Sequence, residues 1–245
     1  MNADGRTNGH AQRQTLHSPL GLLAELTHRC PLGCPYCSNP LAMDSHRDEL
    51  DAATWARVFG EAAALGVLQV HLSGGEPASR RDLTEIMAAA RGAGVYTNLI
   101  TSGVGVTDKR LGELFDAGLD HVQISVQDSE AKSADHIAGY DGAYARKRAL
   151  AAQVVALKLP LTVNIVIHRA NIERIDALVA MALDMGASRV EIAHVQYYGW
   201  ALKNRATLMP TREQVEHAVG RVQALRDQHH GRIVIDAAEI GRAHV

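Results

Sequence analysis

From Leu22 onward, short apolar segments alternate along the chain with longer amphipathic segments. The short segments are rich in β-branched residues or alternate apolar with polar residues, and this pattern predicts β-strands. The strands are expected at Leu22–Thr27, Leu68–Ser73, Val95–Ile100, Asp120–Val126, Leu161–Ile167, Arg189–Val195 and Arg232–Ile235. The longer segments predict helices at Ala52–Leu65, Arg81–Ala93, Asp108–Ala117, Tyr144–Leu157, Asn171–Met185 and Thr211–Gln228.

Six strand–helix units followed by one more strand indicate an α/β fold, in which helices cover a mostly parallel sheet. Right-handed connections leave two arrangements open, a barrel or an open doubly wound sheet. We interpret residues 19–236 as one domain. Residues 1–18 are polar and show no periodicity, which predicts a flexible N-terminal tail.

Composition narrows the possible functions. The 245 residues are 47% hydrophobic, which is enough for a large core and argues against global disorder. The 25 Lys and Arg nearly balance 27 Asp and Glu, so no nucleic-acid partner is expected. No apolar run reaches about 18 residues, and the N-terminus lacks the apolar segment of a signal peptide. We therefore expect a cytoplasmic protein with no membrane partner.

All three cysteines, Cys30, Cys34 and Cys37, lie in a CxxxCxxC segment directly after the first strand. In parallel α/β folds, ligands collect at the carboxyl ends of the strands. Three clustered thiols suit zinc or an iron–sulfur cluster better than a disulfide framework. Zinc needs a fourth ligand, for which His28 or His46 is available. A cubane held by three cysteines leaves one iron open for a small molecule.

A second motif, Gly74-Gly75-Glu76-Pro77, follows the second strand. Together with CxxxCxYC it resembles the radical S-adenosylmethionine (SAM) superfamily. The resemblance implies a partial (βα)6 TIM-like barrel, in which the three cysteines hold a [4Fe–4S] cluster and SAM chelates its open iron. Glycines let the backbone approach the methionine part of SAM, and Glu76 either accepts a hydrogen bond from its ammonium group or braces the turn.

The resemblance also implies further SAM contacts near strand ends. Asp128 is an alternative to Gln127 for the polar contact at the end of the fourth predicted strand. A mid-strand amide among apolar residues, Asn164, needs a polar partner and is otherwise a satisfied barrel-interior group. His168, at the end of the same strand, is interpreted as structural or solvent-facing, with a catalytic role as the alternative. The predicted contacts are Tyr36, Ser102, Ser125, Gln127 and Asn164, in addition to Gly74, Gly75 and Glu76.

Several segments, above all residues 195–205 (VQYYGWALKNR), resemble PqqE, the family of PqqA peptide cyclases in pyrroloquinoline quinone (PQQ) biosynthesis. The resemblance implies a carbon–carbon crosslink between a glutamate and a tyrosine of the precursor peptide PqqA, made through a 5′-deoxyadenosyl radical. It also implies the peptide chaperone PqqD as a partner and a flavodoxin-like reductant. Aromatic residues and arginine at a barrel mouth indicate a surface for the peptide, with a loop packed over the barrel end as the alternative. The candidates are Tyr197, Tyr198, Trp200 and Arg205.

Two alternatives to this function remain at this point. One is another peptide-modifying radical SAM enzyme of the sulfatase-maturase type, against which residues 195–205 argue. The other is a zinc-stabilised peptide-binding domain, which does not explain the GGEP segment.

The chain departs from that family after the last predicted strand. No cysteine follows Cys37, whereas full-length members continue into a SPASM domain whose cysteines bind auxiliary iron–sulfur clusters. The last seven residues, 239–245, match what a common sequencing-adapter DNA would encode. We therefore expect a truncated fragment with an artefactual end, in which auxiliary clusters belong only to the full-length protein. Such a fragment is expected to cleave SAM without completing the crosslink.

Overall fold

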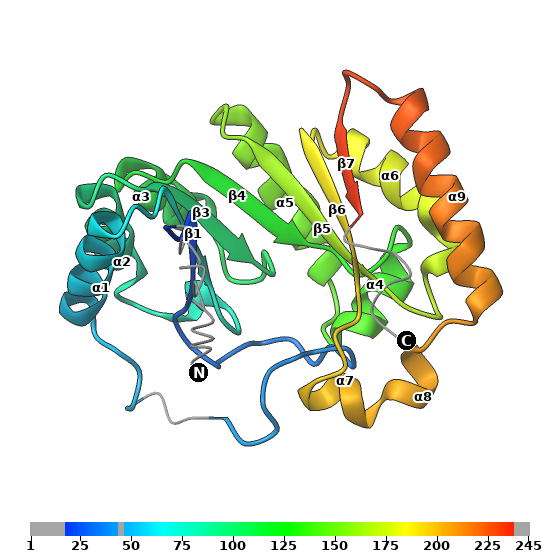
Figure 1. Cartoon of the computed structure of the whole chain (residues 1–245), viewed down its shortest axis with the longest axis horizontal. Coiled ribbons are helices and arrows are strands. Elements are labelled where there is room, and N and C mark those ends of the chain that lie inside the picture. The colour runs from blue at the N-terminus through cyan, green and yellow to red at the C-terminus, as the bar shows by residue number, and fades with distance from the viewer. Residues whose placement is uncertain (1–17, 44–46, 238–245) are drawn as a thin grey trace, which may run out of the picture.

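The computed structural model describes residues 18–43 and 47–237, which form a seven-stranded sheet flanked by helices (Figure 1). Every strand is parallel to its neighbours, and the order in the sheet is the order in the chain. The strands are β1 (Gly21–Glu25), β2 (Gln69–Ser73), β3 (Tyr96–Thr101), β4 (His121–Ser125), β5 (Leu161–Ile167), β6 (Arg189–His194) and β7 (Val234–Ala237).

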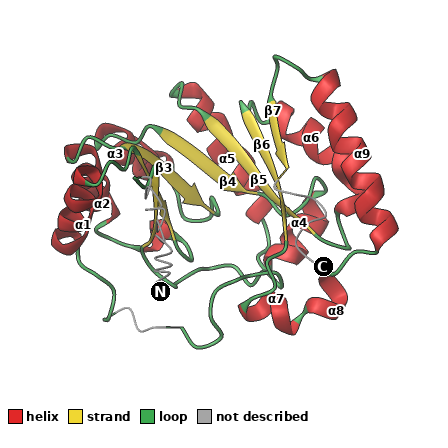
Figure 2. Cartoon of the chain, viewed as in Figure 1, coloured by secondary structure: helices red, strands yellow, loops and turns green. Residues whose placement is uncertain are grey.

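This strand order decides between the two predicted arrangements. A doubly wound sheet reverses its strand order at a switch point, whereas here the sequence runs from β1 to β7 without reversal. The helices lie on one side of the curved sheet, and the described strands do not close between β1 and β7 (Figure 2). The prediction of a partial, TIM-like α/β barrel is therefore confirmed, with a seventh strand after the six units.

All six predicted helices form, within a few residues of their expected bounds. Asn171–Met185 is divided into a short 3-10 turn, Ile172–Arg174, and the α-helix Ile175–Asp184. The helices are α1 (Ala52–Ala64), α2 (Leu83–Gly92), α3 (Asp108–Asp116), α5 (Ala143–Ala156), α6 (Ile175–Asp184) and α9 (Arg212–Gln228). The capping box of Thr211 and Gln214 is present at the start of α9.

Four short elements were not predicted. They are the 3-10 turn Pro77–Ser79 and the helices α4 (Ala131–Ala138), α7 (Gly199–Lys203) and α8 (Arg205–Leu208). The last strand also lies later than Arg232–Ile235, because the turn after α9 extends to Arg232, whose backbone N–H donates to His229 O at 2.9 Å. Short helices of this kind show too few periods to be recognised in a sequence.

The two faces of the sheet differ in chemistry. Alternate residues such as Leu72 and Val122 are fully buried and pack in the apolar core that the sheet shares with the helices. The residues between them point into the barrel, and many are polar. His71 and Asn98 form one hydrogen-bonded pair there (2.9 Å), and Gln123 donates to Glu191 (3.1 Å). The barrel interior therefore offers polar partners to a ligand.

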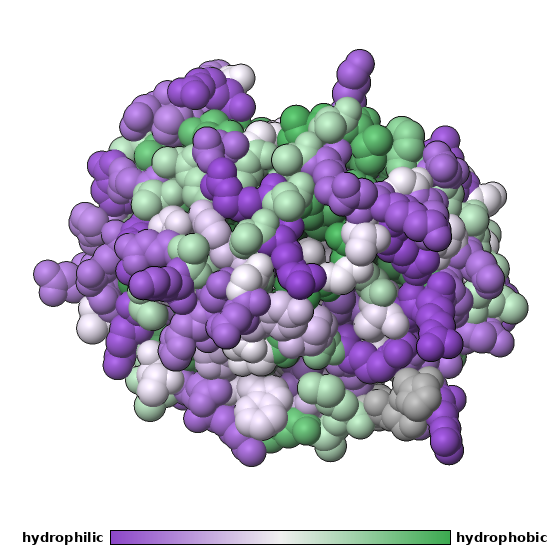
Figure 3. Space-filling view, turned by 180° about the vertical axis from the view of Figure 1, so that it is seen from behind, coloured by the Kyte–Doolittle hydropathy of each residue, from purple (hydrophilic) through white to green (hydrophobic). Residues whose placement is uncertain are grey.

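Some predictions fall outside the described residues. These are most of the N-terminal tail (residues 1–17), the alternative zinc ligand His46, and the suspected artefact at residues 239–245. Within the described part, no helix is long and apolar enough to cross a membrane. The face seen from behind carries mostly hydrophilic residues with smaller hydrophobic areas between them (Figure 3).

Candidate functional site

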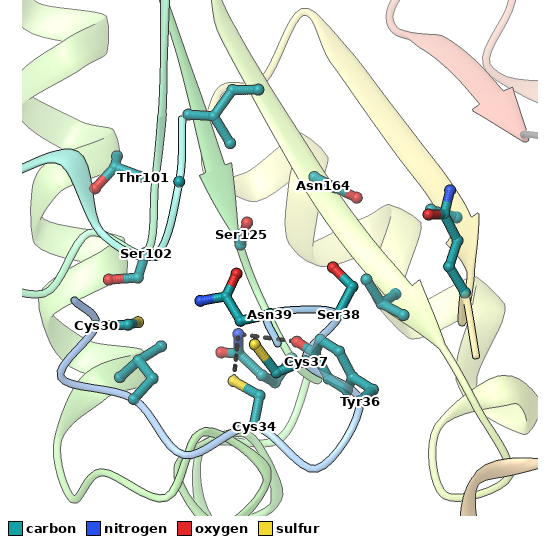
Figure 4. Close-up of a pocket in the computed structure, with 18 of the residues that line it drawn as sticks. Cys30, Cys34, Tyr36, Cys37, Ser38, Asn39, Thr101, Ser102, Ser125 and Asn164 are labelled. Carbon is teal, nitrogen blue, oxygen red and sulfur yellow. Dashed lines mark hydrogen bonds between the residues drawn. The ribbon is translucent and has the colours of Figure 1, made fainter. Parts of the chain in front are cut away.

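A cavity of about 330 Å³ opens at the carboxyl ends of the strands (Figure 4). Its size is within the range of small-molecule sites. It brings together the three cysteines and seven of the eight predicted SAM contacts, although these residues come from five different segments. The predicted residues that line it are Cys30, Cys34, Tyr36, Cys37, Gly74, Gly75, Ser102, Ser125, Gln127 and Asn164.

The cysteine loop is anchored where it approaches α4. The backbone N–H of Gly33 donates to Ala138 O at 2.8 Å, and Gly139, with φ of +63°, packs directly against Gly33. A left-handed glycine is the usual way for a helix to end, and here it leaves room for the loop. The loop then turns back on itself, with Cys37 N donating to Cys34 O at 3.1 Å.

The thiols of the loop face the cavity from different sides, with Cys34 and Cys37 close together and Cys30 opposite (Figure 4). Burial raises the pKa of Cys34 to about 11 and also raises the pKa of Cys30. In residues 18–43 and 47–237, no three His, Cys, Asp or Glu side chains are arranged around a single ion. A cubane suits this spacing better than zinc does, because each of its cysteines binds a different iron.

A buried lysine on α5 stands behind the cavity. Lys147 is fully buried, and its Nζ donates to the backbone oxygen of Ser125 at 2.8 Å. Burial lowers the pKa of Lys147 to about 8, while the nearby Cys34 and Glu76 oppose this shift. Sequence analysis did not single out this residue, although its position on the apolar face that also carries Leu150 was a signal.

Glu76 is the one predicted SAM contact that does not line the cavity. Its buried carboxylate accepts hydrogen bonds from Ala78 N at 2.9 Å, from Thr101 Oγ1 at 2.8 Å and from Ser102 N at 2.6 Å. Of the two roles left open for Glu76, its contacts support bracing the turn between β2 and β3. These backbone and hydroxyl donors surround the carboxylate, and direct contact of Glu76 with SAM stays a prediction.

The two glycines of the GGEP segment are needed for packing as well as for access. A Cβ on Gly74 would overlap the backbone of Thr27, and one on Gly75 would overlap Arg29 O. Gly75 N also donates to Thr27 O at 2.6 Å. The glycines therefore hold the end of β2 against the start of the cysteine loop, while both still line the cavity.

Gln127, rather than its neighbour Asp128, faces the cavity. Its Nε2 donates to Tyr36 Oη at 3.1 Å. Its buried Oε1 has no hydrogen-bond partner among the described residues, and neither has Oδ1 of Asn164. Two unpartnered acceptors at one cavity indicate a ligand that donates hydrogen bonds. Asp128 is fully buried and paired with Arg174 instead.

His168 is buried beside Tyr36, with their ring centroids 5.6 Å apart. Burial lowers the pKa of His168 to about 4, so the ring is neutral at pH 7. A structural role for His168 fits this buried position, in which the ring does not face solvent.

The four predicted peptide contacts do not line the cavity. Among the described residues 195–205, only Gln196 lines it. Tyr197 packs against buried Val195 and Ala201, and its ring centroid lies 5.5 Å from the guanidinium carbon of Arg205. Tyr198 and Trp200 are exposed by 68% and 41%. Packing thus accounts for Tyr197, whereas Tyr198 and Trp200 are exposed on the surface.

Relatives of known name resemble almost the whole described chain. A PqqA peptide cyclase of Methylocella silvestris is 65% identical over 219 residues, covering 89% of this chain and 59% of the relative. One from Ruegeria pomeroyi is 53% identical over 230 residues, covering 94% and 62%. The chain therefore spans about three fifths of the length of these relatives.

Solved structures share the fold. Streptococcus suis SuiB bound to S-adenosylmethionine superposes with a TM-score of 0.77 at 20% identity, covering 90% of this chain and 50% of that protein. The enzyme anSMEcpe with bound AdoMet and a peptide gives 0.70 at 16% identity, covering 89% and 63%. Residues 24–182, from β1 to α6, match the model of the radical SAM superfamily. The chain belongs to the radical SAM superfamily.

Proposed function

We propose that this chain is the cluster- and SAM-binding core of a PqqA peptide cyclase, with residues 19–236 as its domain. The observation that carries the proposal is the meeting of three thiols and seven predicted SAM contacts at one cavity. Identities of 53–65% to PqqA peptide cyclases support the assignment among radical SAM proteins.

In this proposal, Cys30, Cys34 and Cys37 hold a [4Fe–4S] cluster, and SAM occupies the rest of the cavity. Bound together and given one electron by a reductant, these groups would supply the radical chemistry that removes a hydrogen atom from the substrate, with SAM cleaved to methionine and 5′-deoxyadenosine. The protein positions them and excludes water. The unpartnered oxygens of Gln127 and Asn164 accept hydrogen bonds from SAM, and Tyr36 holds Gln127 in place.

The substrate in this proposal is the precursor peptide PqqA, in which a glutamate and a tyrosine become joined by a carbon–carbon bond during PQQ biosynthesis. PqqD presents the peptide, a flavodoxin-like protein reduces the cluster, and the reaction takes place in the cytoplasm. The relatives are longer than this chain, which covers 59% of one of them. These partners are therefore proposed for a protein of the relatives' full length. Auxiliary iron–sulfur clusters are likewise expected in the full-length protein.

The sulfatase-maturase type remains the nearest alternative enzyme. The PqqA peptide cyclases share more than half of the aligned residues with this chain. Identity of that level favours the PqqA reaction. A zinc-stabilised peptide-binding domain is less well supported, because it does not explain the GGEP segment, whose glycines line the cavity.

The test begins with the chain reconstituted anaerobically with iron and sulfide. Wild-type protein is expected to bind one [4Fe–4S] cluster and to form 5′-deoxyadenosine from SAM when dithionite is added. Cys34→Ala is expected to lose both, because a cubane needs three thiolates to leave a single open iron. Zinc without iron or sulfide in the anaerobically isolated protein would support the zinc-stabilised domain instead.

Substrate identity needs a separate experiment with the full-length protein. PqqA incubated with PqqD, SAM and a reductant is expected to yield a crosslinked peptide, detected by mass spectrometry. A sulfatase peptide under the same conditions is the control, and its modification in place of PqqA would favour the alternative enzyme.

A further inference from the structure

The α7–α8 segment, Gly199–Leu208, follows β6 and lies directly against the cysteine loop (Figure 1). Two hydrogen bonds join them. The backbone N–H of Ala201 donates to Cys37 O at 3.1 Å, and Nδ2 of Asn204 donates to Pro35 O at 3.0 Å. The two accepting carbonyls lie on either side of Tyr36, so together they restrain the backbone between Cys34 and Cys37.

Close packing at the start of α7 adds to these bonds. Gly199 has a φ of +52°, and a Cβ at this position would overlap the backbone oxygen of Asn39. Only glycine lets the helix begin so near the residues that follow Cys37, because any side chain would push the two segments apart.

The side chain between the two cysteines is held by the same segment. Tyr36 packs against an apolar cluster formed by Val195, Ala201 and Leu208, all of which are buried. Ala201 therefore contributes both a hydrogen bond and an apolar contact to the loop. Residues 35–37 of the loop are thus restrained through both side chain and backbone. The restraining residues are Val195, Gly199, Ala201, Asn204 and Leu208.

We propose that the α7–α8 segment is a clamp that keeps Cys34 and Cys37 in register for the iron–sulfur cluster, with Asn204 as its positioning residue. The contacts between the α7–α8 segment and the cysteine loop are present in the metal-free chain. Only the identity of the cluster rests on the proposed function. Asn204 is half-buried and lies outside the cavity, so it acts on the cluster through Pro35 and not by contact.

Hydrogen exchange of the metal-free chain tests the clamp without any cofactor. Asn204→Ala removes the donor to Pro35 O, and backbone exchange in residues 34–39 is expected to become about fivefold faster, as the loss of one ordinary hydrogen bond allows. Lys203→Ala is the matched control, because Lys203 contacts the ring of Trp200 and is expected to leave this exchange unchanged. Unchanged exchange in Asn204→Ala would overturn the proposal.

Release of iron to a chelator from reconstituted protein is the second measurement. It is expected to be several times faster in Asn204→Ala than in wild type and Lys203→Ala, while far-UV circular dichroism shows the same helix content. Equal release rates in folded variants would overturn the link between the clamp and the cluster. If wild-type protein bound no iron, the proposed function would fail, and hydrogen exchange would still decide whether the clamp exists.

Discussion

Glu76 and Ser102 join the ends of two neighbouring strands beside the cavity. The carboxylate of Glu76 accepts from both the hydroxyl (2.5 Å) and the backbone N–H (2.6 Å) of Ser102. Glu76 follows β2 and Ser102 follows β3, so this pair fixes how the two strand ends present their backbone to a ligand. A carboxylate suits the position because it is an acceptor at both oxygens.

Glu76→Gln is therefore expected to destabilise the metal-free chain. The amide that replaces one carboxylate oxygen cannot accept, so buried donors of Thr101 or Ser102 are left unsatisfied, at a cost of about 2–3 kcal/mol. Urea unfolding measures the difference. Glu85→Gln, in the exposed first turn of α2, is the control. Equal unfolding free energies for Glu76→Gln and wild type would return Glu76 to the role of a ligand contact.

Lys147→Met should change how stability depends on pH. The pKa of Lys147 is lowered from 10.5 to about 8 in the folded chain, so between these values the unfolded state binds more protons and stability rises with pH. From pH 8 to pH 9 the metal-free wild type should therefore gain stability relative to the variant, by at most about 1.4 kcal/mol.

Thermal unfolding at both pH values measures this gain. Above pH 9 the thiol of Cys34 lowers the stability as the pH rises. Its pKa is raised to about 11 in the folded chain, so the folded chain keeps a proton that the unfolded chain loses. Lys158→Met, in the turn after α5, provides the matched control, for which no difference in slope is expected. A wild-type profile parallel to that of Lys147→Met over pH 8–9 would mean that Lys147 is charged and compensated in the metal-free chain.

Much of the barrel could be predicted because its signals are long and repeated. Seven apolar segments with helices between them imply parallel strands, and the structure has them in the expected order. The short helices α4, α7 and α8 have 8, 5 and 4 residues, too few to show a helical period. These are also the elements that contact the cysteine loop, so sequence alone located the cysteines but not their supports.

The candidate site shows the same division. Residues in the CxxxCxxC and GGEP motifs, such as Cys34 and Gly75, could be predicted as site residues because each motif combines specific residue types at fixed spacing. The role of Glu76 could not be decided, because it depends on donors that are 25 and 26 residues away in the chain. Lys147 was missed because a lysine on a helix is usually solvated, and only the fold places it behind the cavity.

The exposed side chains of Tyr198 and Trp200 are predicted to contact the peptide PqqA. Replacing Tyr198 or Trp200 by serine should weaken binding of labelled PqqA about tenfold, in line with the loss of an aromatic anchor, while the iron content stays unchanged. Fluorescence anisotropy with the reconstituted chain measures the affinity. Tyr96→Ser is the matched control, since Tyr96 is also 41% exposed but lies at the start of β3. Equal affinities for all three variants would leave this segment with its packing role alone.

Asp128→Asn tests the ion pair beneath Gln127. Burial alone would raise the pKa of Asp128, but donors on Arg174, Ser133 and Ser129 more than offset it and hold the pKa below its usual value. Such a group stabilises the fold above its unfolded pKa of about 3.9, and this contribution is lost as pH falls through the folded pKa. The variant should therefore be less stable at pH 7 by about 2–3 kcal/mol, with a deficit that shrinks as the pH falls below about 4.

Melting temperatures between about pH 2 and pH 7 measure this deficit, because the range must extend below the lowered pKa of Asp128. Asp116→Asn, at the exposed end of α3, serves as the control, because it should follow the wild-type curve throughout. A deficit that stays constant across this range would mean that Asp128 contributes through packing and neutral hydrogen bonds. A deficit that shrinks in acid would assign the stabilisation to the charge of Asp128, which holds Arg174 against the end of β4 and thereby supports the backbone that carries Gln127 into the cavity.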